Sequence, residues 1–307
     1  MRVLVLGAGA TGGYFGARML EAGAKVSFLV RPHRAALLAE NGLRIHAGGR
    51  ETCSQVEALT SVPDDLAWDL VLLSCKSYDL PSGIEAIAPA VAGGARVLPL
   101  LNGMRHLDML DKAFGRDSVL GGLCHVSVNM DQDGSIRQTG SIARLTFGER
   151  DGTRPMDEEL VHELLTMPFE VVHSVDVISA MWQKFAFLSA LAGATCLMRA
   201  SVGEIVAVAE GAGLIRWLYL ECAEVARRSG HAPSDVAMAE AIDILSAAHS
   251  PLKASMLRDV ERGGRTEAEH VLGDMLSRAN ALGVDAPLLG TACVNLRVHE
   301  ARLTGPP

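Results

Sequence analysis

A lysine stands at the start of the most apolar helical stretch in the chain. Lys184 follows Met181-Trp-Gln and precedes Phe185–Met198, in a sequence with only five lysines among its 28 basic residues. Burial in apolar surroundings lowers the pKa of a lysine, and such a lysine can protonate the oxygen of a carbonyl substrate. The alternative is a lysine whose stem lies along apolar surface while its ammonium stays in water.

Two further polar residues occupy positions where a site could form. Asn102 comes directly after the apolar strand predicted at Arg96–Leu101, at a carboxyl end of the sheet, where ligands bind. Asparagine is also a common turn residue, which is the alternative. Glu267 follows Thr266, a predicted helix cap, so its carboxylate could serve the helix terminus instead of a substrate.

The N-terminus carries a glycine motif typical of dinucleotide binding. Gly7–Gly12 (GAGATG) leaves a strand predicted at Arg2–Leu6 and opens a helix predicted at Thr11–Ala22. The first glycine allows a tight turn, the second lets the backbone approach the pyrophosphate, and the third lets the helix pack on the strand. N–H groups at the helix start then face the anion. The alternative is a glycine turn without a ligand. The predicted cofactor-binding residues of this loop are Gly7, Gly9, Ala10, Thr11 and Gly12.

The end of the second predicted strand favours NADP over NAD. An NAD site places an acidic residue there to accept a hydrogen bond from the ribose 2′-hydroxyl. Here Lys25–Val30 is followed by Arg31, which is placed to hold a 2′-phosphate, and Arg34 offers a second cation. The alternative for Arg31 is a solvated surface arginine. Lys76 follows the strand predicted at Asp69–Ser74, and we expect it to help hold the cofactor phosphate rather than to be merely exposed.

Two halves with different periodicity position these residues. Up to about residue 172, short β-branched runs alternate with helical stretches, which indicates a parallel sheet with right-handed crossovers. Ser118–Gly148 instead indicates shorter antiparallel strands around a turn at Asp131–Gly134, closing the edge of the domain. From about Ser174 only helical patterns follow. We therefore predict an α/β Rossmann-type domain at 1–172 and an all-α domain at 173–307. The long helices predicted in the second domain are Ile178–Met198, Val202–Ser229, Ser234–His249, Thr266–Leu282 and Pro287–Leu303.

The composition argues against several other classes of protein. With 49% hydrophobic and 21% charged residues, the chain of 307 residues is not a disordered one. A formal net charge of −8 without a basic block argues against nucleic-acid and anionic-membrane partners. Six scattered cysteines indicate reduced thiols in a cytoplasm, and the histidines form no metal-ligand pattern. The longest apolar stretch, Phe185–Met198, falls short of the ~20 residues that span a bilayer, so we expect a soluble, cytoplasmic protein.

Together these motifs resemble the ketopantoate reductase (2-dehydropantoate 2-reductase) family, an NADPH-dependent branch of the 6-phosphogluconate-dehydrogenase-like group. The resemblance runs nearly end to end. It rests on GAGATGG at the start, Arg31, Lys76, the LNGM around Asn102, the W-x-K that ends at Lys184, and SML-x-D…TE from Ser255 to Glu267. It implies a cofactor on the Rossmann domain, a C-terminal domain like that of 6-phosphogluconate dehydrogenase, and a substrate in the cleft between the domains.

The resemblance also implies a role for each matching residue. Lys184 would be the general acid that protonates the ketone oxygen as hydride arrives. Glu267 would orient this lysine and the substrate hydroxyl. Ser255 would bind the substrate carboxylate, and Asn102 would lie near the nicotinamide and the substrate.

The helix that carries the lysine departs from the family pattern. The family has asparagine one helical turn after the lysine and, in some members, a second one a turn later, whereas here the residues are Leu188 and Ala192. All three positions share one face, so Lys184 looks along an apolar wall that includes Leu188 as a predicted substrate contact. Missing hydrogen bonds to a substrate cost a large factor in discrimination. Thr195 offers a partial replacement.

Three functions are compatible with these residues. The leading hypothesis is NADPH-dependent reduction of ketopantoate to pantoate, a step of pantothenate biosynthesis. The second is reduction of a different, more apolar 2-oxo acid on the same fold. The third is an NADP-binding redox sensor without turnover, against which the retained Lys184 and Glu267 argue. The expected partner is a small 2-oxo acid, and the sequence leaves a homodimer open.

Overall fold

The computed structural model describes residues 1–63 and 65–304, and the chain forms two compact units. The first comprises Met1–Leu101 with His106–Val177. The second begins at Ile178 and also includes the short segment Asn102–Arg105. The chain therefore passes from the first unit to the second between Val177 and Ile178, five residues after the predicted boundary at 172–173. The first unit is built on a parallel sheet and the second on helices, which confirms the predicted fold class.

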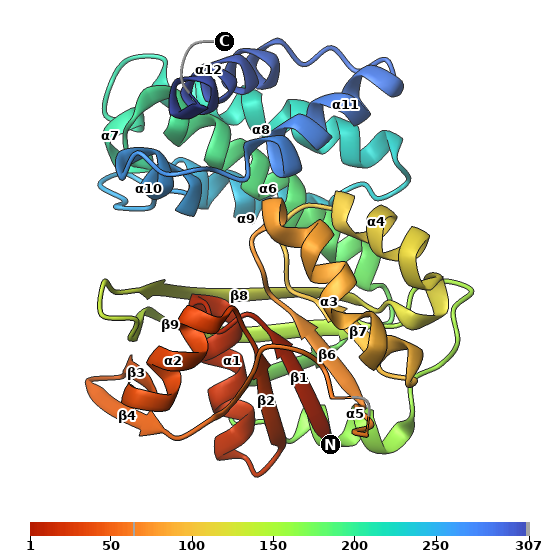
Figure 1. Ribbon diagram of the computed structural model, residues 1–307. Helices are drawn as coiled ribbons and strands as arrows, with labels where there is room; N and C mark the ends of the chain where they lie inside the picture. Colours follow the sequence, from red (N-terminus) through yellow and green to blue (C-terminus); the bar gives the residue numbers. More distant parts are fainter. Residues whose placement is uncertain (64, 305–307) are drawn as a thin grey trace. The chain divides into compact units, whose positions relative to one another are not determined.

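A parallel sheet of five strands forms the centre of the first unit (Figure 1). In spatial order its strands are β5 (Glu57–Leu59), β2 (Lys25–Leu29), β1 (Arg2–Leu6), β6 (Leu70–Leu73) and β7 (Arg96–Pro99). The chain runs outward from β1 through β2 to β5, and then crosses back to β6 on the other side of β1. Ligands of doubly wound sheets bind outside the carboxyl ends of the strands at such a reversal.

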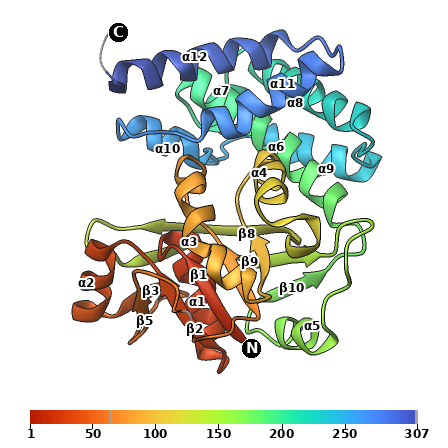
Figure 2. The same ribbon diagram turned by 45° about the vertical axis from the view of Figure 1, so that its right-hand side comes forward.

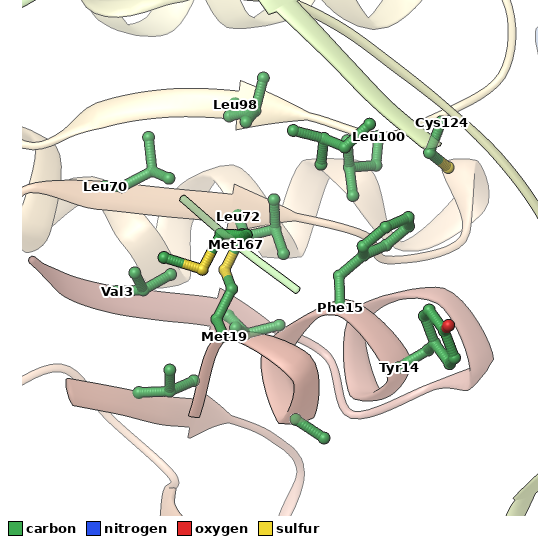
Figure 3. Packing of buried hydrophobic residues seen from close by; sticks show 14 of the residues in the cluster. Val3, Tyr14, Phe15, Met19, Leu70, Leu72, Leu98, Leu100, Cys124 and Met167 are labelled. Carbon is green, nitrogen blue, oxygen red and sulfur yellow. The ribbon is translucent and has the colours of Figure 1, made fainter. Parts of the chain in front are cut away.

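Helices on both faces explain why these strands are continuous apolar runs. On one face Phe15 and Met19 of α1 (Ala10–Glu21) pack with Val3, Leu70 and Leu72 (Figure 3). On the other face lies α3 (Leu80–Ala92), whose Gly83 contacts Leu6 so closely that a side chain there would collide with it. The strand and the helix on either side of the glycine loop, β1 and α1, are thereby packed into the core.

A second sheet covers the far side of α1. Its strands are β10 (Glu170–His173), β9 (Ile136–Gly148), β3 (Leu43–Ala47) and β4 (Arg50–Ser54) in that order, with β8 (Gly121–Met130) paired to β9. The predicted antiparallel hairpin with a turn at Asp131–Gly134 is confirmed as β8 and β9. The prediction of shorter strands is wrong, because β8 has 10 residues and β9 has 13, more than any strand of the parallel sheet. Rather than forming an edge of the parallel sheet, the hairpin belongs to this separate sheet. Tyr14 of α1 joins the two layers, because its hydroxyl donates to Gln138 of β9 at 3.2 Å.

The second unit consists of helices and turns in its described part (Figure 2). They are α6 (Val177–Met198), α7 (Val202–Val206), α8 (Gly211–Arg228), α9 (Asp235–Leu245), α10 (Ser255–Glu261), the π-helical turn η3 (Glu269–Gly273), α11 (Asp274–Ala281) and α12 (Pro287–Thr304). The remaining helices, all in or at the border of the first unit, are α2 (Pro32–Asn41), α4 (Arg105–Phe114) and α5 (Glu158–Leu165).

Three of the predicted helices are wrong in extent. The helix predicted at Ser234–His249 ends already at Leu245. Val202–Ser229 is interrupted between α7 and α8, where Glu210 adopts a left-handed backbone with φ of 64°. Thr266–Leu282 begins instead with an extended loop and the π-helical turn. Neither the α7–α8 junction nor the Thr266 turn contains proline, so neither carries a strong stop signal.

Helix α6 also corrects the expectation that the most apolar stretch of the chain is too short to span a bilayer. The apolar stretch Phe185–Met198 is part of this helix, which was predicted at Ile178–Met198 and spans Val177–Met198, and its 22 residues are long and apolar enough to cross a bilayer. Of the most apolar part of this helix, 61% is buried inside the protein, and a mostly buried core helix of a soluble protein has the same length and composition. A single helix of this kind is weak evidence for a membrane span.

Candidate functional site

The glycine loop has the geometry that a dinucleotide phosphate needs. Gly7 adopts φ of 93°, which favours glycine, and its N–H donates to the carbonyl of Leu29 at 2.9 Å. Gly9 is the N-terminal cap residue of α1, and a Cβ added to it would meet only open space. In the described α1, no side chain caps the helix start and no acidic residue stands in its first turn. Its first N–H groups are therefore available to an anion.

Gly12 has the opposite environment to Gly9. A Cβ on Gly12 would overlap the hydroxyl of Ser74 and the carbonyl oxygen of Gly7. Ser74 in turn donates to the carbonyl of Leu6 at 3.1 Å, so the helix start and the ends of β1 and β6 are in direct contact. The open space at Gly9 and the tight packing at Gly12 are the arrangement that the motif predicts, and they fit a nicotinamide dinucleotide.

Arg31 lies where the sequence places a phosphate ligand, but it has a partner. It is the N-terminal cap residue of α2, its side chain is 75% exposed, and its Nη2 lies 2.7 Å from Oδ1 of Asp79. Asp79 ends a short 3₁₀ turn directly after Lys76, which is itself partly buried at the end of β6. Asp79 was missed by the sequence analysis because nothing in its local sequence indicates a contact with Arg31.

Arg34 does not serve as a second exposed cation. Its Nε donates to the carbonyl of Ala8 at 3.2 Å, and its Nη2 donates to the carbonyl of Gly134 at 3.0 Å. Burial lowers the pKa of this guanidinium from its ordinary value. Arg34 thus holds the glycine loop to the turn of the β8–β9 hairpin.

Three segments of the second unit converge on Gly103. Gly103 has φ of 84°, and a Cβ on it would lie 3.1 Å from the carbonyl oxygen of His270 and 3.7 Å from Cε2 of Phe185. Phe185 follows Lys184 on α6, and His270 lies one turn beyond Glu267. The structure therefore brings the Asn102 segment, the Lys184 turn of α6 and the Glu267 turn together.

The loop that carries Glu267 is held by α12. The backbone N–H and the hydroxyl of Thr266 both donate to Oε1 of Glu300, at 2.7 and 2.6 Å. The Thr266 hydroxyl also accepts the N–H of Ala268 at 3.3 Å, although the N-terminal cap residue of η3 is Ala268 itself. His299 contacts the carbonyl of Gly264 through Nε2 at 3.0 Å. Glu267 itself is partly exposed on this fixed loop.

His270 is a buried residue of this region that the sequence analysis missed. Its side chain is hydrogen-bonded to the backbone of Asn102. Desolvation lowers the pKa of His270 to about 4; Arg105 also lowers it, while Glu267 and the bond to Asn102 oppose the shift. The imidazole is therefore neutral near pH 7.

The face of α6 that carries Lys184 is apolar, as the sequence predicts, and Thr195 adds no polar group to it. Lys184 and Leu188 are partly buried, and Ala192 is buried. The expected replacement by Thr195 is wrong, because this side chain is fully buried and its hydroxyl donates to the carbonyl of Leu191 at 2.7 Å. Ser255 is exposed at the first position of α10.

Trp182 fixes the start of α6. Its indole is stacked with His231 at 6.0 Å between ring centroids, and the guanidinium of Arg278 lies 5.5 Å from its ring. This buried contact sets the turn of α6 that carries Lys184. Within residues 1–63 and 65–304, no group of three His, Cys, Asp or Glu side chains is arranged to hold a metal ion.

Comparisons with known proteins agree over nearly the whole chain. A family model described as ketopantoate reductase PanE/ApbA matches residues 3–152, and the model of its C-terminal part matches residues 176–300. An uncharacterized oxidoreductase of Bacillus subtilis, YkpB, is 36% identical over 303 residues, which cover 98% of this chain and 99% of the relative. A 2-dehydropantoate 2-reductase of Archaeoglobus fulgidus is 29% identical over 305 residues, with coverage of 98% and 99%.

Solved structures show the same fold. A PanE/ApbA family ketopantoate reductase from Ralstonia eutropha has a TM-score of 0.87 at 28% identity, covering 99% of this chain and 100% of that one. D-mandelate dehydrogenase with NADH and anilino(oxo)acetate has a TM-score of 0.89 at 19% identity, covering 99% of both chains. At that identity the second likeness shows the fold alone.

Proposed function

Because this chain belongs to the ketopantoate reductase PanE/ApbA family, we propose that it is an NADPH-dependent reductase of a 2-oxo acid, with 2-dehydropantoate as substrate and pantoate as product. The observation that carries the proposal is the convergence at Gly103 of three segments, which bear Asn102, Lys184 and Glu267. A redox sensor without turnover would have no use for the retained Lys184 and Glu267.

Each group has a defined task in the proposed reaction. The N–H groups at the start of α1 bind the pyrophosphate, while Arg31 and Lys76 hold the phosphates. A reduced nicotinamide, when bound, supplies the hydride. Lys184 gives its proton to the ketone oxygen, which becomes the hydroxyl of the product, and Glu267 orients the lysine. Ser255 binds the substrate carboxylate, and Asn102 contacts the nicotinamide and the substrate.

The direct test is NADPH oxidation with a panel of 2-oxo acids that includes 2-dehydropantoate and acids with apolar side chains. We expect the highest kcat/KM with 2-dehydropantoate. Oxidation with none of them, in a protein that still binds NADPH, would favour the sensor and contradict the proposal.

A second candidate function, reduction of a more apolar 2-oxo acid, is favoured by the α6 face. Leu188 and Ala192 give it no hydrogen-bonding group, and the Thr195 hydroxyl is already used. An apolar pocket discriminates by only about 1–3 kcal/mol per methylene, whereas an unpaired polar group costs more. The two candidates therefore predict different responses to a polar residue at position 188.

We expect Leu188→Asn to leave kcat/KM for 2-dehydropantoate nearly unchanged, because another group already serves the substrate hydroxyl in the proposed function. Steady-state kinetics of the wild type and the variant with both substrates measure this. Leu188→Met, which conserves volume and polarity, is the matched control and should change neither reaction greatly. A large gain for 2-dehydropantoate with a loss for an apolar acid would instead establish the second candidate.

The cofactor proposal gives a separate prediction. We expect NADPH to bind at least about tenfold more tightly than NADH, which is on the order of 1.4 kcal/mol. Arg31→Ala should abolish this ratio. Asp79→Asn should tighten NADPH binding, because its carboxylate then no longer competes with the 2′-phosphate for Arg31. Fluorescence titrations of the three proteins with both cofactors give the dissociation constants, and equal affinities in the wild type would contradict NADP preference.

The remaining proposals concern partners and location. We propose a cytoplasmic enzyme whose partners are small molecules rather than nucleic acid or a membrane, in keeping with the net charge of −8. Light scattering of the purified protein distinguishes a monomer from the homodimer that the sequence leaves open.

A further inference from the structure

His270 lies at the junction of the Asn102 segment and the Glu267 turn. Its side chain is only 7% exposed, and it comes from η3, directly after the loop that carries Glu267. Its ring bonds to the Asn102 backbone, and this bond raises the pKa of the imidazole. A bond that favours the protonated ring is one in which the ring N–H donates, so the acceptor is the Asn102 carbonyl.

A second contact fixes the same two segments. A Cβ added to Gly103 would lie 3.1 Å from the carbonyl oxygen of His270, and Gly103 has a left-handed φ of 84°. A side chain at this position would strain the backbone and press on His270. The ring and the backbone of one residue thus contact two successive residues of the Asn102 segment.

The π-helical turn gives His270 a rigid base. Glu269 turns away from His270 toward α12, where its carboxylate binds Arg297 with oxygen–nitrogen distances of 2.6 and 3.1 Å. Gly273 lets the turn close, because a Cβ there would overlap the Glu269 carboxylate. Such π-turns inside helices are frequent at functional sites. With Thr266 held by Glu300, both sides of His270 in the chain are tied to α12.

The surroundings of His270 keep its imidazole uncharged, so that it acts as a hydrogen-bond donor rather than as a cation. Glu267 and Arg105 act on it with opposite signs, and burial keeps the imidazole neutral near pH 7. A neutral ring donates one N–H and forms no ion pair with Glu267.

We propose that His270 is a positioning residue, which holds the Asn102 segment in a fixed place relative to Glu267 and to the Lys184 turn of α6. Its kinetic consequence rests on the proposed function. Without the bond, the Asn102 segment shifts and the reacting groups lose their alignment, and a misplacement of about 1 Å can cost ~10²-fold in rate.

The test compares His270→Leu, which removes the donor, with His270→Asn and His270→Gln, which together offer an amide N–H near either ring nitrogen. We expect His270→Leu to lower kcat by about 10- to 100-fold with an NADPH dissociation constant within about threefold of the wild type. One of the amide variants should restore most of the kcat. His162→Leu, on the exposed surface of α5, is the histidine control and should behave as the wild type.

Amide hydrogen exchange of the peptide 100–106 provides a readout that needs no substrate. We expect faster exchange in His270→Leu than in the wild type or in the restoring amide variant. A wild type that reduces no 2-oxo acid would refute the proposed function, while this exchange measurement would still decide the role of His270. Unchanged exchange and unchanged kcat in a folded His270→Leu protein would overturn the inference.

Gly103→Ala keeps the inference testable if His270→Leu fails to fold. The added methyl group would push against the carbonyl oxygen of His270 and displace the same two segments. This variant should therefore show the same loss of kcat with little change in NADPH binding. A folded Gly103→Ala protein with wild-type kcat and wild-type exchange would overturn the inference as well.

Discussion

Replacing Lys184 by alanine is expected to lower kcat by ~10²-fold or more on the best 2-oxo acid, as general-acid catalysis typically contributes. The lysine stands on the turn of α6 that Trp182 fixes and that contacts the Asn102 segment through Phe185. In the proposed reaction, its removal leaves the ketone oxygen without a proton donor while hydride arrives at the carbon. The NADPH dissociation constant should stay within about threefold, because the proposed role of Lys184 is to protonate the substrate rather than to hold the cofactor.

Two variants separate proton donation from charge. Lys184→Arg keeps the positive charge, but a guanidinium with a pKa above about 12 is a poor acid, so it should restore KM far better than kcat. Lys112→Ala removes an exposed lysine of α4 and should have wild-type kinetics. Near-normal turnover of Lys184→Ala would show that this lysine only extends to solvent, and the role implied by the family would be wrong.

Local constraints explain which parts of the fold could be predicted from sequence. The β1–loop–α1 unit was predictable because each glycine of the loop is required by the backbone conformation or by the close packing of neighbouring atoms. The start of α7 was equally local: Ser201 and Glu204 form a capping box, a spacing that indicates a helix start at Val202, where the predicted Val202–Ser229 helix begins.

Contacts distant in sequence explain what was missed. Strand β3 gains its partner β9 from far along the chain, so the mixed second sheet has no local signature. Asp79 meets Arg31 only because β6 returns beside β1 in the sheet. His270 likewise meets Asn102 only once the helices of the second unit pack, and burial, rather than spacing, gives it its properties.

The other large effect concerns the two glycines of the cofactor loop, which should fail in different ways. Gly12→Ala places a methyl group into the Gly7 carbonyl oxygen and the Ser74 hydroxyl. One of these is backbone, so the loop must move. Overpacking of this kind costs about 1–3 kcal/mol of unfolding free energy, and the displaced loop should also lose most of its NADPH affinity.

Gly9→Ala should instead lose affinity without losing stability. Its φ of −77° suits alanine, and the added methyl meets open space, which is the space that the motif reserves for the pyrophosphate. We therefore expect an unchanged Tm and an NADPH dissociation constant raised by about tenfold or more, since the backbone can no longer approach the phosphate. Thermal unfolding without ligand, together with NADPH titration, measures both quantities in each variant.

Gly290→Ala is the matched control for both substitutions. Gly290 lies inside α12, and its added Cβ also meets open space, so alanine should raise stability by about 0.5–1 kcal/mol and leave NADPH binding unchanged. A Gly9→Ala protein that binds NADPH as the wild type does would show that no phosphate lies against Gly9. The ordinary φ of Gly9 and the open space around it give no reason for alanine to destabilise the fold. An unstable Gly9→Ala protein would therefore show that this glycine is needed for folding rather than for the cofactor.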